Sequence, residues 1–430
     1  MVTAFVDMVG LLMVIPLIPF YAMKFGAGGT VVGVLVSSYA LAQLLSAPMW
    51  GRMSDRYGRR PALLVGLAAS AIAYVIFSFA TSIWILLLSR LVQGAGGGTT
   101  GVIQAYVADA TAPRDRAKAL GWLSAATNMG VAIGPLLGSH SLAWGEKTPG
   151  FLAAGLCVVN MAFAAVYLRE SRVVHAPQAG AAKPAGSRTL IGHVLTRPAE
   201  PAPRMIWIYA IAMGAFSGFT AILALFLSQR FGVTAKTVGW AYTWNACIGV
   251  LVRAFFLGKL IDRWGEARIS RVGQVLLTAG LVLMPFTWRF TGNVPLPFAV
   301  HMAPMHLGGG HLSYPAFSAG ATLVPLKFLV LAVVIALIPL GTAFTFPAVT
   351  ATLSRVISER ERGVYMGVQQ SFGGAARVLG PVWAGWSFEH WGSQYPFWTG
   401  AALVFATLWL GIGMERFTRD EVEEAAPAPG

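Results

Sequence analysis

The stretch Gly51-Arg-Met-Ser-Asp-Arg-Tyr-Gly-Arg-Arg60 decides the fold of this chain, because a second copy of it follows 207 residues later. The second copy reads Gly258-Lys-Leu-Ile-Asp-Arg-Trp-Gly265. Each copy is a short charged turn between two long apolar runs. Two copies at this separation predict a chain built from two repeated halves.

The composition places these halves in a membrane. Hydrophobic residues make up 56% of the 430 positions and charged residues only 11%, far from the balance of a soluble globular protein. Apolar runs of about 20 residues, each long enough to cross a bilayer, follow one another along the chain. We therefore predict an all-α polytopic membrane protein with twelve transmembrane helices in two pseudo-symmetric six-helix bundles. The predicted spans are about 2–23, 30–50, 61–80, 83–109, 117–139, 149–168, 206–229, 237–257, 269–288, 327–354, 364–386 and 396–414.

Landmarks further along the chain repeat at a larger separation. Gly134-Pro135 corresponds to Gly380-Pro381, 246 residues later, and Arg116 corresponds to Arg362. The second half therefore contains 39 more residues than the first, and these lie between the ninth and tenth predicted spans. The shared order of the motifs indicates parallel repeats, related by an axis along the membrane normal.

The segment between the halves is rich in Ala, Pro, Gly and Arg and has no apolar periodicity, which predicts a flexible basic linker. The last residues are acidic and then rich in Ala and Pro, which predicts a disordered tail. The predicted domains are an N-terminal six-helix bundle at 1–169, a cytoplasmic linker at 170–205, a C-terminal six-helix bundle at 206–415 with an external insertion at about 289–327, and a cytoplasmic tail at 416–430.

The positive charge of the chain follows the topology. With the first span directed outward, six of the 31 Lys and Arg residues fall outside and three fall within spans, so that the other 22 are cytoplasmic. This is the positive-inside distribution of a membrane protein. Both termini are then cytoplasmic, and the net charge of +14 gives no support to nucleic-acid binding. The six outer residues are Lys24, Lys147, Arg230, Lys236, Arg289 and Lys327.

Charged side chains within the predicted spans are candidates for function. Asp7 is the one carboxylate clearly inside a span, and a carboxylate at bilayer depth is costly unless it is paired or protonated. A role in coupling or substrate charge competes there with a solvated position near the helix start. For Arg90 and Arg377 the alternative is snorkelling toward the interface. Arg253 lies five residues from a loop, where we expect a structural role.

The insertion holds three of the seven histidines of the chain. Imidazole and thioether groups together could bind copper or a similar metal. The surrounding Pro and Gly residues give no fixed geometry, so we expect an external loop without a metal site. The residues in question are His301, Met302, Met305, His306 and His311.

Glycines recur every four residues in the fifth predicted span. Gly130, Gly134 and Gly138 share one helix face, and Pro135 lies beside them. Small residues at this spacing allow two helices to approach closely. We expect this face to pack tightly at the interface between the two halves.

Four stretches match known transporter motifs in their order along the chain. They are Phe5-Val-Asp7 through Pro16-Leu-Ile-Pro19 in helix 1, Gly51–Arg60 between helices 2 and 3, Arg90-Leu-Val-Gln93-Gly94 in helix 4, and Gly130-Val-Ala-Ile-Gly134-Pro135-Leu-Leu-Gly138 in helix 5. With these motifs the chain resembles the major facilitator superfamily, and within it the drug:proton antiporters typified by tetracycline exporters. The resemblance covers nearly all of the first half and, more loosely, the second.

The resemblance implies roles for individual residues. Asp7 and Arg90 would serve proton coupling, and the helix-5 stretch would be the antiporter motif, with Gly130, Gly134, Pro135 and Gly138 as its residues. A cytoplasmic gate would hold one conformation through an aspartate facing the amides of a helix N-terminus, and it would break when the halves rock. The predicted gate residues are Gly51, Asp55, Arg56, Gly58, Arg59, Asp109, Arg116, Asp262 and Arg263.

The substrate end departs from tetracycline exporters. Their helix 3 has an acidic residue where this chain has Ala73, and their helix-8 histidine is replaced near Gly249. We therefore do not expect tetracycline itself as the substrate. The polar candidates for substrate contact are Gln43, Gln93, Asn128, Asn245, Gln369 and Arg377.

The sequence thus predicts a multi-pass protein of the inner (plasma) membrane that exports small amphipathic organic compounds in exchange for protons, by alternating access. It would act as a monomer, without cofactor, metal or nucleic acid. Two alternatives stay open. One is a proton-coupled importer of an organic anion, favoured by three membrane arginines against one aspartate, and the other is a membrane sensor or metal-handling protein. We do not expect an enzyme, because the sequence has no phosphate loop, nucleophile motif or convincing metal-ligand set.

Overall fold

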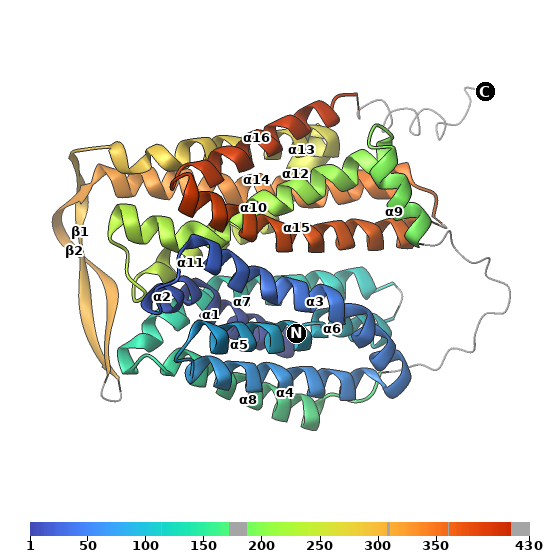
Figure 1. Cartoon of the computed structure of the whole chain (residues 1–430), viewed down its shortest axis with the longest axis horizontal. Coiled ribbons are helices and arrows are strands. Elements are labelled where there is room, and N and C mark those ends of the chain that lie inside the picture. The colour runs from blue at the N-terminus through green and yellow to red at the C-terminus, as the bar shows by residue number, and fades with distance from the viewer. Residues whose placement is uncertain (113, 172–186, 308–309, 360, 414–430) are drawn as a thin grey trace.

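The computed structural model describes the chain except residues 113, 172–186, 308–309, 360 and 414–430, and for residues 117, 187–188 and 296–322 it describes the backbone alone (Figure 1). Within the described residues the elements are helices and one β hairpin. The hairpin corrects the all-α prediction, while the helical character of the rest agrees with it. The predicted tail at 416–430 lies outside the described residues.

The helices before the linker form one group in space, drawn in the lower part of Figure 1. Within this group α1 packs against α7 and α8, and α4 packs against α5 and α8. The elements are α1 (Val2–Val14), η1 (Ile15–Leu17), α2 (Ile18–Lys24), α3 (Gly29–Tyr57), α4 (Arg59–Ser78), α5 (Ile83–Gly96), α6 (Thr99–Asp109), α7 (Arg116–Ser141), η2 (Leu142–Trp144) and α8 (Thr148–Tyr167).

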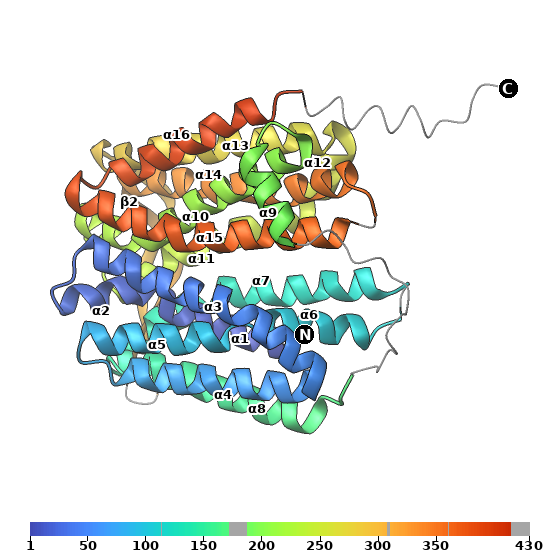
Figure 2. The same ribbon diagram turned by 45° about the vertical axis from the view of Figure 1, so that its right-hand side comes forward.

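The elements after the linker form a second group, drawn above the first in Figures 1 and 2. Here α10 packs against α14, α15 and α16, and α13 packs against α14 and α16. The elements are α9 (Ser187–Thr196), α10 (Pro201–Phe231), α11 (Val238–Leu251), η3 (Val252–Phe256), α12 (Leu257–Trp264), α13 (Glu266–Leu283), η4 (Met284–Arg289), β1 (Asn293–Leu307), β2 (Gly310–Pro325), α14 (Leu326–Val356), α15 (Arg362–His390) and α16 (Tyr395–Leu410).

Equivalent positions in the two groups have the same local structure. Gly58 and Gly265 end α3 and α12 with positive φ angles of 108° and 77°, which glycine adopts without steric cost. Arg116 and Arg362 begin α7 and α15, and each donates through Nε to the carbonyl oxygen eight residues before it, at 3.0 and 3.2 Å. The repeat seen in the sequence is therefore also a repeat of backbone and hydrogen bonds.

Nine helical segments among the described residues are long and apolar enough to cross a membrane. The other three predicted spans fall short of this standard. α5 and α6 are separated by Gly97-Gly98, α15 carries polar residues such as Gln369 and Arg377 in its middle, and α16 has only 16 residues. A helix of 16 residues is about 24 Å long, less than the hydrocarbon thickness of about 30 Å.

Part of the predicted flexible linker is a helix, and for that part the prediction was wrong. α9 packs against α10 and α15. Val194 is fully buried there, and its carbonyl oxygen accepts a hydrogen bond from the indole nitrogen of Trp207 at 3.1 Å. Leu190 and Val194 share one face at helical spacing, a stripe too short to stand out against the Pro- and Ala-rich composition. Residues 172–186 lie outside the described part.

The predicted external loop contains a β hairpin. β1 and β2 pair antiparallel, with Asn293 opposite Pro325 and an irregularity between Leu296 and Phe298. β2 contacts both α14 and η2, so the hairpin reaches from the second group across to the first (Figure 1). We call this end of the molecule the hairpin end, and the end with α9 the linker end.

No group of three or more His, Cys, Asp or Glu among the described residues could hold a metal ion. The side chains of the candidate metal cluster in the hairpin lie outside the described residues. They are His301, Met302, Met305, His306 and His311.

Replacing residues 291–324 with a short Gly/Ser linker should leave the helical groups folded. The free energy of closing a loop changes slowly with loop length, and helix packing joins the two groups at this end. We expect a melting temperature within about 3 °C of the intact protein, the shift that about 1 kcal/mol produces in a large domain. A Gly/Ser linker of the original length is the control for length, and a much larger loss of stability in both variants would show that the hairpin supports the fold.

Candidate functional site

The main contacts between the halves come from two helix pairs, α3 with α15 and α7 with α11. Their backbones approach closely at glycines. A Cβ atom at Gly33 would lie 2.3 Å from the carbonyl oxygen of Pro381, and one at Gly239 would lie 2.4 Å from that of Pro135. Because Pro135 and Pro381 are equivalent in the repeats, the two contacts are pseudo-symmetric. We call them the α3–α15 seam and the α7–α11 seam.

Hydrogen bonds cross both seams. The Ser37 hydroxyl donates to the carbonyl oxygen of Val378 at 2.5 Å across the α3–α15 seam. The Thr243 hydroxyl donates to the carbonyl oxygen of Ala132 at 2.8 Å across the α7–α11 seam. A Ser or Thr hydroxyl reaches a carbonyl oxygen of another helix only where the two helices lie close together. The halves are therefore in contact from the hairpin end to about mid-helix.

The glycine motif of the fifth span does not lie at a seam, so the prediction that it packs between the halves was wrong. Gly130 and Gly138 face α1 of their own half, where a Cβ would lie 2.6 Å from the Phe5 carbonyl oxygen and 2.1 Å from that of Met13. Gly134 lies between them on the same face. The carbonyl oxygen of Pro135, beside them in the sequence, faces Gly239 on α11 instead.

Glu389 closes the α3–α15 seam at the hairpin end. Its Oε2 accepts a hydrogen bond from the backbone nitrogen of Thr30 at 2.8 Å, in the first turn of α3. A carboxylate in this position is stabilised by the positive end of the helix dipole. The contact joins a charge of the second half to a helix terminus of the first. It could not be predicted, because the two residues lie 359 positions apart.

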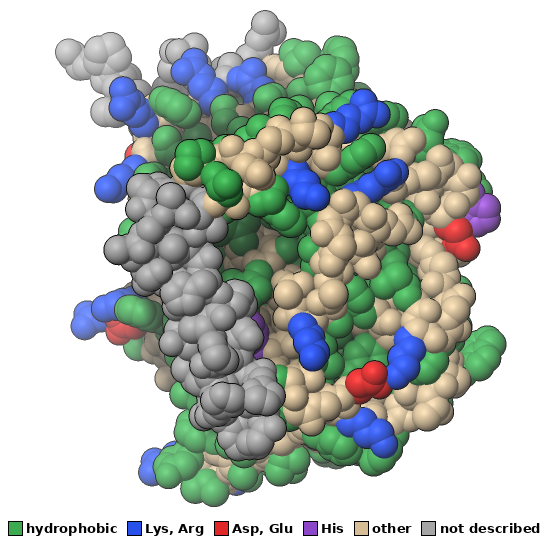
Figure 3. Space-filling model, turned by 90° about the vertical axis from the view of Figure 1, so that its left-hand side faces the viewer, with side chains coloured by type: hydrophobic (Ala, Val, Ile, Leu, Met, Phe, Trp, Pro, Cys, Tyr) green, Lys and Arg blue, Asp and Glu red, His purple; other side chains and the backbone are tan. Residues whose placement is uncertain are grey.

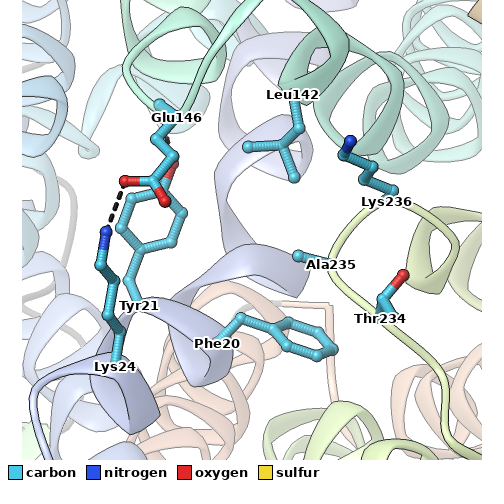
Figure 4. A pocket seen from close by; sticks show the side chains of 8 residues that line it. All are labelled: Phe20, Tyr21, Lys24, Leu142, Glu146, Thr234, Ala235 and Lys236. Carbon is cyan, nitrogen blue, oxygen red and sulfur yellow. Dashed lines mark hydrogen bonds and ion pairs between the residues drawn. The ribbon is translucent and has the colours of Figure 1, made fainter.

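A pocket of about 420 Å³ lies between the halves at the hairpin end. In Figure 3 this end of the molecule is hollowed, with hydrophobic side chains at the bottom and Lys and Arg side chains around it. Figure 4 shows Lys24 beside Glu146, an ion pair of 2.5 Å, and the Tyr21 hydroxyl also donates to the Glu146 carbonyl oxygen. The lining residues are Phe20, Tyr21, Lys24, Leu142, Glu146, Thr234, Ala235 and Lys236.

A charged group lies deep in the first half. Arg90 on α5 is only 2% exposed, and its Nε has no hydrogen-bond partner among the described residues. Its guanidinium carbon lies 5.0 Å from the centre of the Tyr39 ring, within the range of a cation–π contact. Beside it Gln93 donates to the Tyr74 hydroxyl at 2.6 Å. The chain thus buries a cation against an aromatic ring, and no carboxylate among the described residues forms an ion pair with it.

Asp7 completes this group. Its side chain is half-buried and makes no hydrogen bond or ion pair within the described part of the chain. The charges of Asp7, Arg90 and Arg377 all lie within electrostatic range of the Tyr39 hydroxyl, to which Gln43 donates at 3.3 Å. Three sequence candidates, from α1, α5 and α15, therefore act electrostatically on the same tyrosine. Tyr39 was missed, because nothing in the local sequence marks it.

The other polar candidates do not share one open surface. Gln93 is 3% exposed and Gln369 is fully buried, so neither side chain faces open space in this conformation. Gln43 is half-buried and also donates to the Gly97 carbonyl oxygen, at 2.9 Å. The side-chain nitrogen of Asn245 is buried without a partner among the described residues.

Arg253 forms a further contact between the halves. Its Nη1 donates to the Oδ1 of Asn128 at 3.4 Å, from η3 to α7. A hydrogen bond between the halves is compatible with the structural role expected for Arg253. The substrate candidate Asn128 takes part in this hydrogen bond.

The predicted gate at the linker end is an ion-pair cluster within the first half. Arg59 bonds Asp55 at 2.6 Å and Asp109 at 3.0 Å. The amides at the start of α4, those of Arg59 and Arg60, donate to the carboxylate of Glu170 at 2.8 and 3.1 Å. The carboxylate that faces a helix N-terminus is therefore Glu170 and not Asp55, which corrects the prediction. Glu170 lies past the last apolar residue of the sixth span and therefore belongs to the segment predicted as the linker.

The second half carries the same ion pair with the charges exchanged. Arg355 bonds Glu266 at 2.6 Å. In the repeat Glu266 corresponds to Arg59 and Arg355 corresponds to Asp109, so the position is kept and the signs are reversed. The predicted pair Asp262-Arg263 is exposed and takes no part in this contact. A search for identical residues could not find this equivalence.

The remaining predicted gate residues have separate places. Gly51 and Arg56 are exposed on α3, and the Arg56 guanidinium lies 5.3 Å from the centre of the Tyr57 ring. Gly58 forms the turn, and Arg116 binds a backbone carbonyl of its own half.

Comparisons with known proteins agree with this architecture. A family model described as Major Facilitator Superfamily matches residues 1–311 and 310–429. Tetracycline resistance protein, class B, of Escherichia coli is 25% identical over 403 residues, covering 93% of this chain and 89% of that protein. Multidrug resistance protein 2 of Bacillus subtilis (strain 168) is 25% identical over 425 residues, covering 98% and 94%.

A solved structure has the same fold. It is the crystal structure of a bacterial homologue of the human lysosomal transporter Spinster, in an inward-facing and occupied conformation. The TM-score is 0.69 at 14% identity, over 99% of this chain and 97% of the other.

The Glu266–Arg355 pair should contribute measurable coupling. Glu266 is nearly buried at 9% exposure and Arg355 is half-exposed, so we expect a coupling of about 0.5 to 1 kcal/mol, at the upper end for such pairs. A cycle of Glu266→Gln, Arg355→Gln and the double variant, followed by thermal unfolding, measures it. The Lys24–Glu146 pair, exposed on both sides, is the matched control and should couple more weakly. Additive effects in the Glu266 cycle would contradict the structural pairing.

Gly385→Leu should force the α3–α15 seam open. A Cβ at Gly385 would lie 2.1 Å from the carbonyl oxygen of Gly29, and a main-chain oxygen cannot move aside without moving its helix. Spin labels at positions 147 and 236, in a cysteine-free background, should report a distance longer by several ångströms. Gly155→Leu, where no atom lies within 4 Å of the added Cβ, is the control and should leave the distance unchanged. An equal change of this distance in both variants would contradict the assignment of the α3–α15 seam.

Proposed function

The chain belongs to the major facilitator superfamily and is a membrane transporter, and on this premise we propose that it is a proton-coupled antiporter that exports small amphipathic organic compounds. The observation that carries the proposal is the group of charges around Tyr39. Asp7 has no ion-pair partner among the described residues, and its charge and that of the buried Arg90 both act on the Tyr39 hydroxyl. An ionisable residue at bilayer depth is a candidate for a proton pathway.

Export is the direction that the relatives favour. Two of them, 25% identical to this chain over most of its length, are resistance proteins for tetracycline and for multiple drugs. Resistance by transport means removal of a compound from the cell. Ala73 and the residues near Gly249 differ from those of tetracycline exporters. The identity of the exported compound therefore stays open, and an apolar or aromatic binding site is favoured over a copy of the tetracycline site.

We infer twelve spans in two bundles of six. α5 and α6 together would form the fourth span, broken at Gly97-Gly98, and α15 and α16 would be the eleventh and twelfth. A polar span such as α15 is stable in a bilayer when its polar face lies against other helices, and α15 packs along both α3 and α10. The basic linker end would be cytoplasmic, with both termini on that side.

Alternating access would operate through the two seams. In this structure the halves touch from the hairpin end to mid-helix, which corresponds to an inward-facing state. The ion pairs of Arg59 with Asp109 and of Arg355 with Glu266 each lie within one half, so they leave the linker end free to separate. Rocking to the outward-facing state would break the Thr30–Glu389 contact and close the linker end.

Coupling follows from the position of Asp7. A carboxylate at bilayer depth is tolerable when it is protonated, hydrated or close to positive charge. Taking up a proton from the outer side and releasing it inside would change the net charge beside Tyr39 once in each cycle. A compound that binds better to one of these charge states would then be moved against its gradient.

Asp7→Asn should abolish pH-driven accumulation while leaving downhill exchange partly intact, because the amide cannot exchange a proton. The assay is uptake of lipophilic dyes into inside-out proteoliposomes under an imposed pH gradient, with proton movement followed in parallel. Asp115→Asn, an exposed position at the linker end, is the matched control and should transport like the wild type. Unchanged uphill transport in Asp7→Asn would remove Asp7 from coupling. Dye movement in the same direction as the protons would support the importer instead.

A further inference from the structure

The structure assigns a second site, outside the transport pathway: we propose that an anionic phospholipid of the linker-side leaflet binds in a groove between α10, α15 and α16, with one acyl chain in the groove and its phosphate at Arg204. The groove has a volume of about 380 Å³. Its lining is apolar throughout and includes Trp207, Gly214, Gly218, Phe372, Leu379 and Gly400.

The groove opens to the bilayer and not to the interior of the protein. Leu379 and Leu403 on its edges are 68% and 54% exposed. The indole nitrogens of Trp207 and Trp383 are both bonded within the protein, to the Val194 carbonyl oxygen at 3.1 Å and to the Thr399 hydroxyl at 3.0 Å. The wall therefore offers no free polar group, and an alkyl chain is the occupant whose chemistry fits it.

The groove has the length of one leaflet. From Trp207 to Gly218 the axis of α10 rises about 16 Å, close to half of the hydrocarbon thickness of about 30 Å. Trp207 lies at the linker end of this stretch, at the depth where indole rings collect near lipid headgroups. A chain that fills the groove would therefore belong to a lipid whose headgroup lies at the linker end.

Arg204 is the group that would receive that headgroup. It lies one helical turn beyond Trp207, on the same face of α10 as Ile211, Gly214 and Gly218. Its Nη1 reaches the carbonyl oxygen of Ile412 only at 3.4 Å, while its Nε is buried without a partner among the described residues. The two outer Nη groups are therefore the donors that a phosphate would meet, side by side in one plane.

The charges around Arg204 do not compete with a phosphate. The nearest acidic residue along the chain is Glu200, which is bound by His193 at 2.7 Å and by Arg197 at 3.2 Å. Arg197 lowers the pKa of the Glu200 carboxyl, which therefore stays ionised and paired. Arg204 is therefore the charge that a headgroup would meet at this end of the groove.

The test compares two lipids that share their acyl chains. The intact protein in detergent is titrated with dioleoylphosphatidylglycerol or with dioleoylphosphatidylcholine, and bound lipid is counted by native mass spectrometry. We expect the anionic lipid to bind about five-fold more tightly, the effect of about 1 kcal/mol per basic residue near a membrane surface. Equal affinities in the wild type would overturn the proposal.

Variants separate the headgroup from the chain. Arg204→Gln should remove the preference, and Arg204→Lys should keep most of it. Gly214→Leu should weaken both lipids by about ten-fold or more, because the side chain fills the groove in place of methylene groups. A Cβ at Gly214 meets the Cβ and the carbonyl oxygen of Ala376, each at 3.7 Å, which is ordinary van der Waals contact, so this variant can fold. Monodispersity and melting temperature confirm the fold of each variant.

Matched controls complete the design. Arg52→Gln removes an exposed charge from the linker end of the first half, and Gly155→Leu adds a side chain to open space on α8. Both should bind the two lipids like the wild type. Glycerol 3-phosphate, a headgroup without chains, should not displace the anionic lipid. Displacement by it, or normal binding to Gly214→Leu, would show that the groove is not part of the site.

Discussion

The close approach of four helix backbones at two glycine contacts is the constraint on which the rest of the structure depends. Gly33 meets the carbonyl oxygen of Pro381, and Gly239 meets that of Pro135. With no Cβ in the way, main-chain atoms of opposite halves touch, and Ser37 and the other seam hydroxyls can reach carbonyl oxygens across them. Van der Waals contact of this kind stabilises helix association in a bilayer, where no hydrophobic effect favours it. The seams therefore fix which end of the molecule is closed.

The distances between the charged groups depend on how the two halves are placed relative to each other. Arg90 and Asp7 lie in the first half and Arg377 in the second, and Tyr39 on α3 lies within electrostatic range of all three charges. Moving the halves changes the distance of Arg377 from the other two. A charge group that spans a moving seam links protonation to conformation, because each state presents a different field to the same carboxylate.

The two halves also share an ion pair at the linker end. At the linker end each half holds one ion pair at the equivalent position, Arg59 with Asp109 and Glu266 with Arg355, with the signs exchanged. The pair energy depends on the product of the two charges, so exchange of the signs leaves it unchanged. This freedom explains how a repeat can keep an interaction while losing the residues that would reveal it in a sequence comparison.

The sequence by itself determined the membrane class, the twofold repeat and the candidate charges Asp7, Arg90 and Arg377, because apolar length, motif spacing and a charge within an apolar run are properties of the chain alone. It did not determine which face of a helix meets which neighbour. The glycines of α7 face α1 and not the seam, Glu170 and not Asp55 binds a helix N-terminus, and residues 187–196 form a helix. Only the tertiary structure decided these points, since a short stripe or a lone carboxylate finds its partner through contacts between residues far apart in the chain.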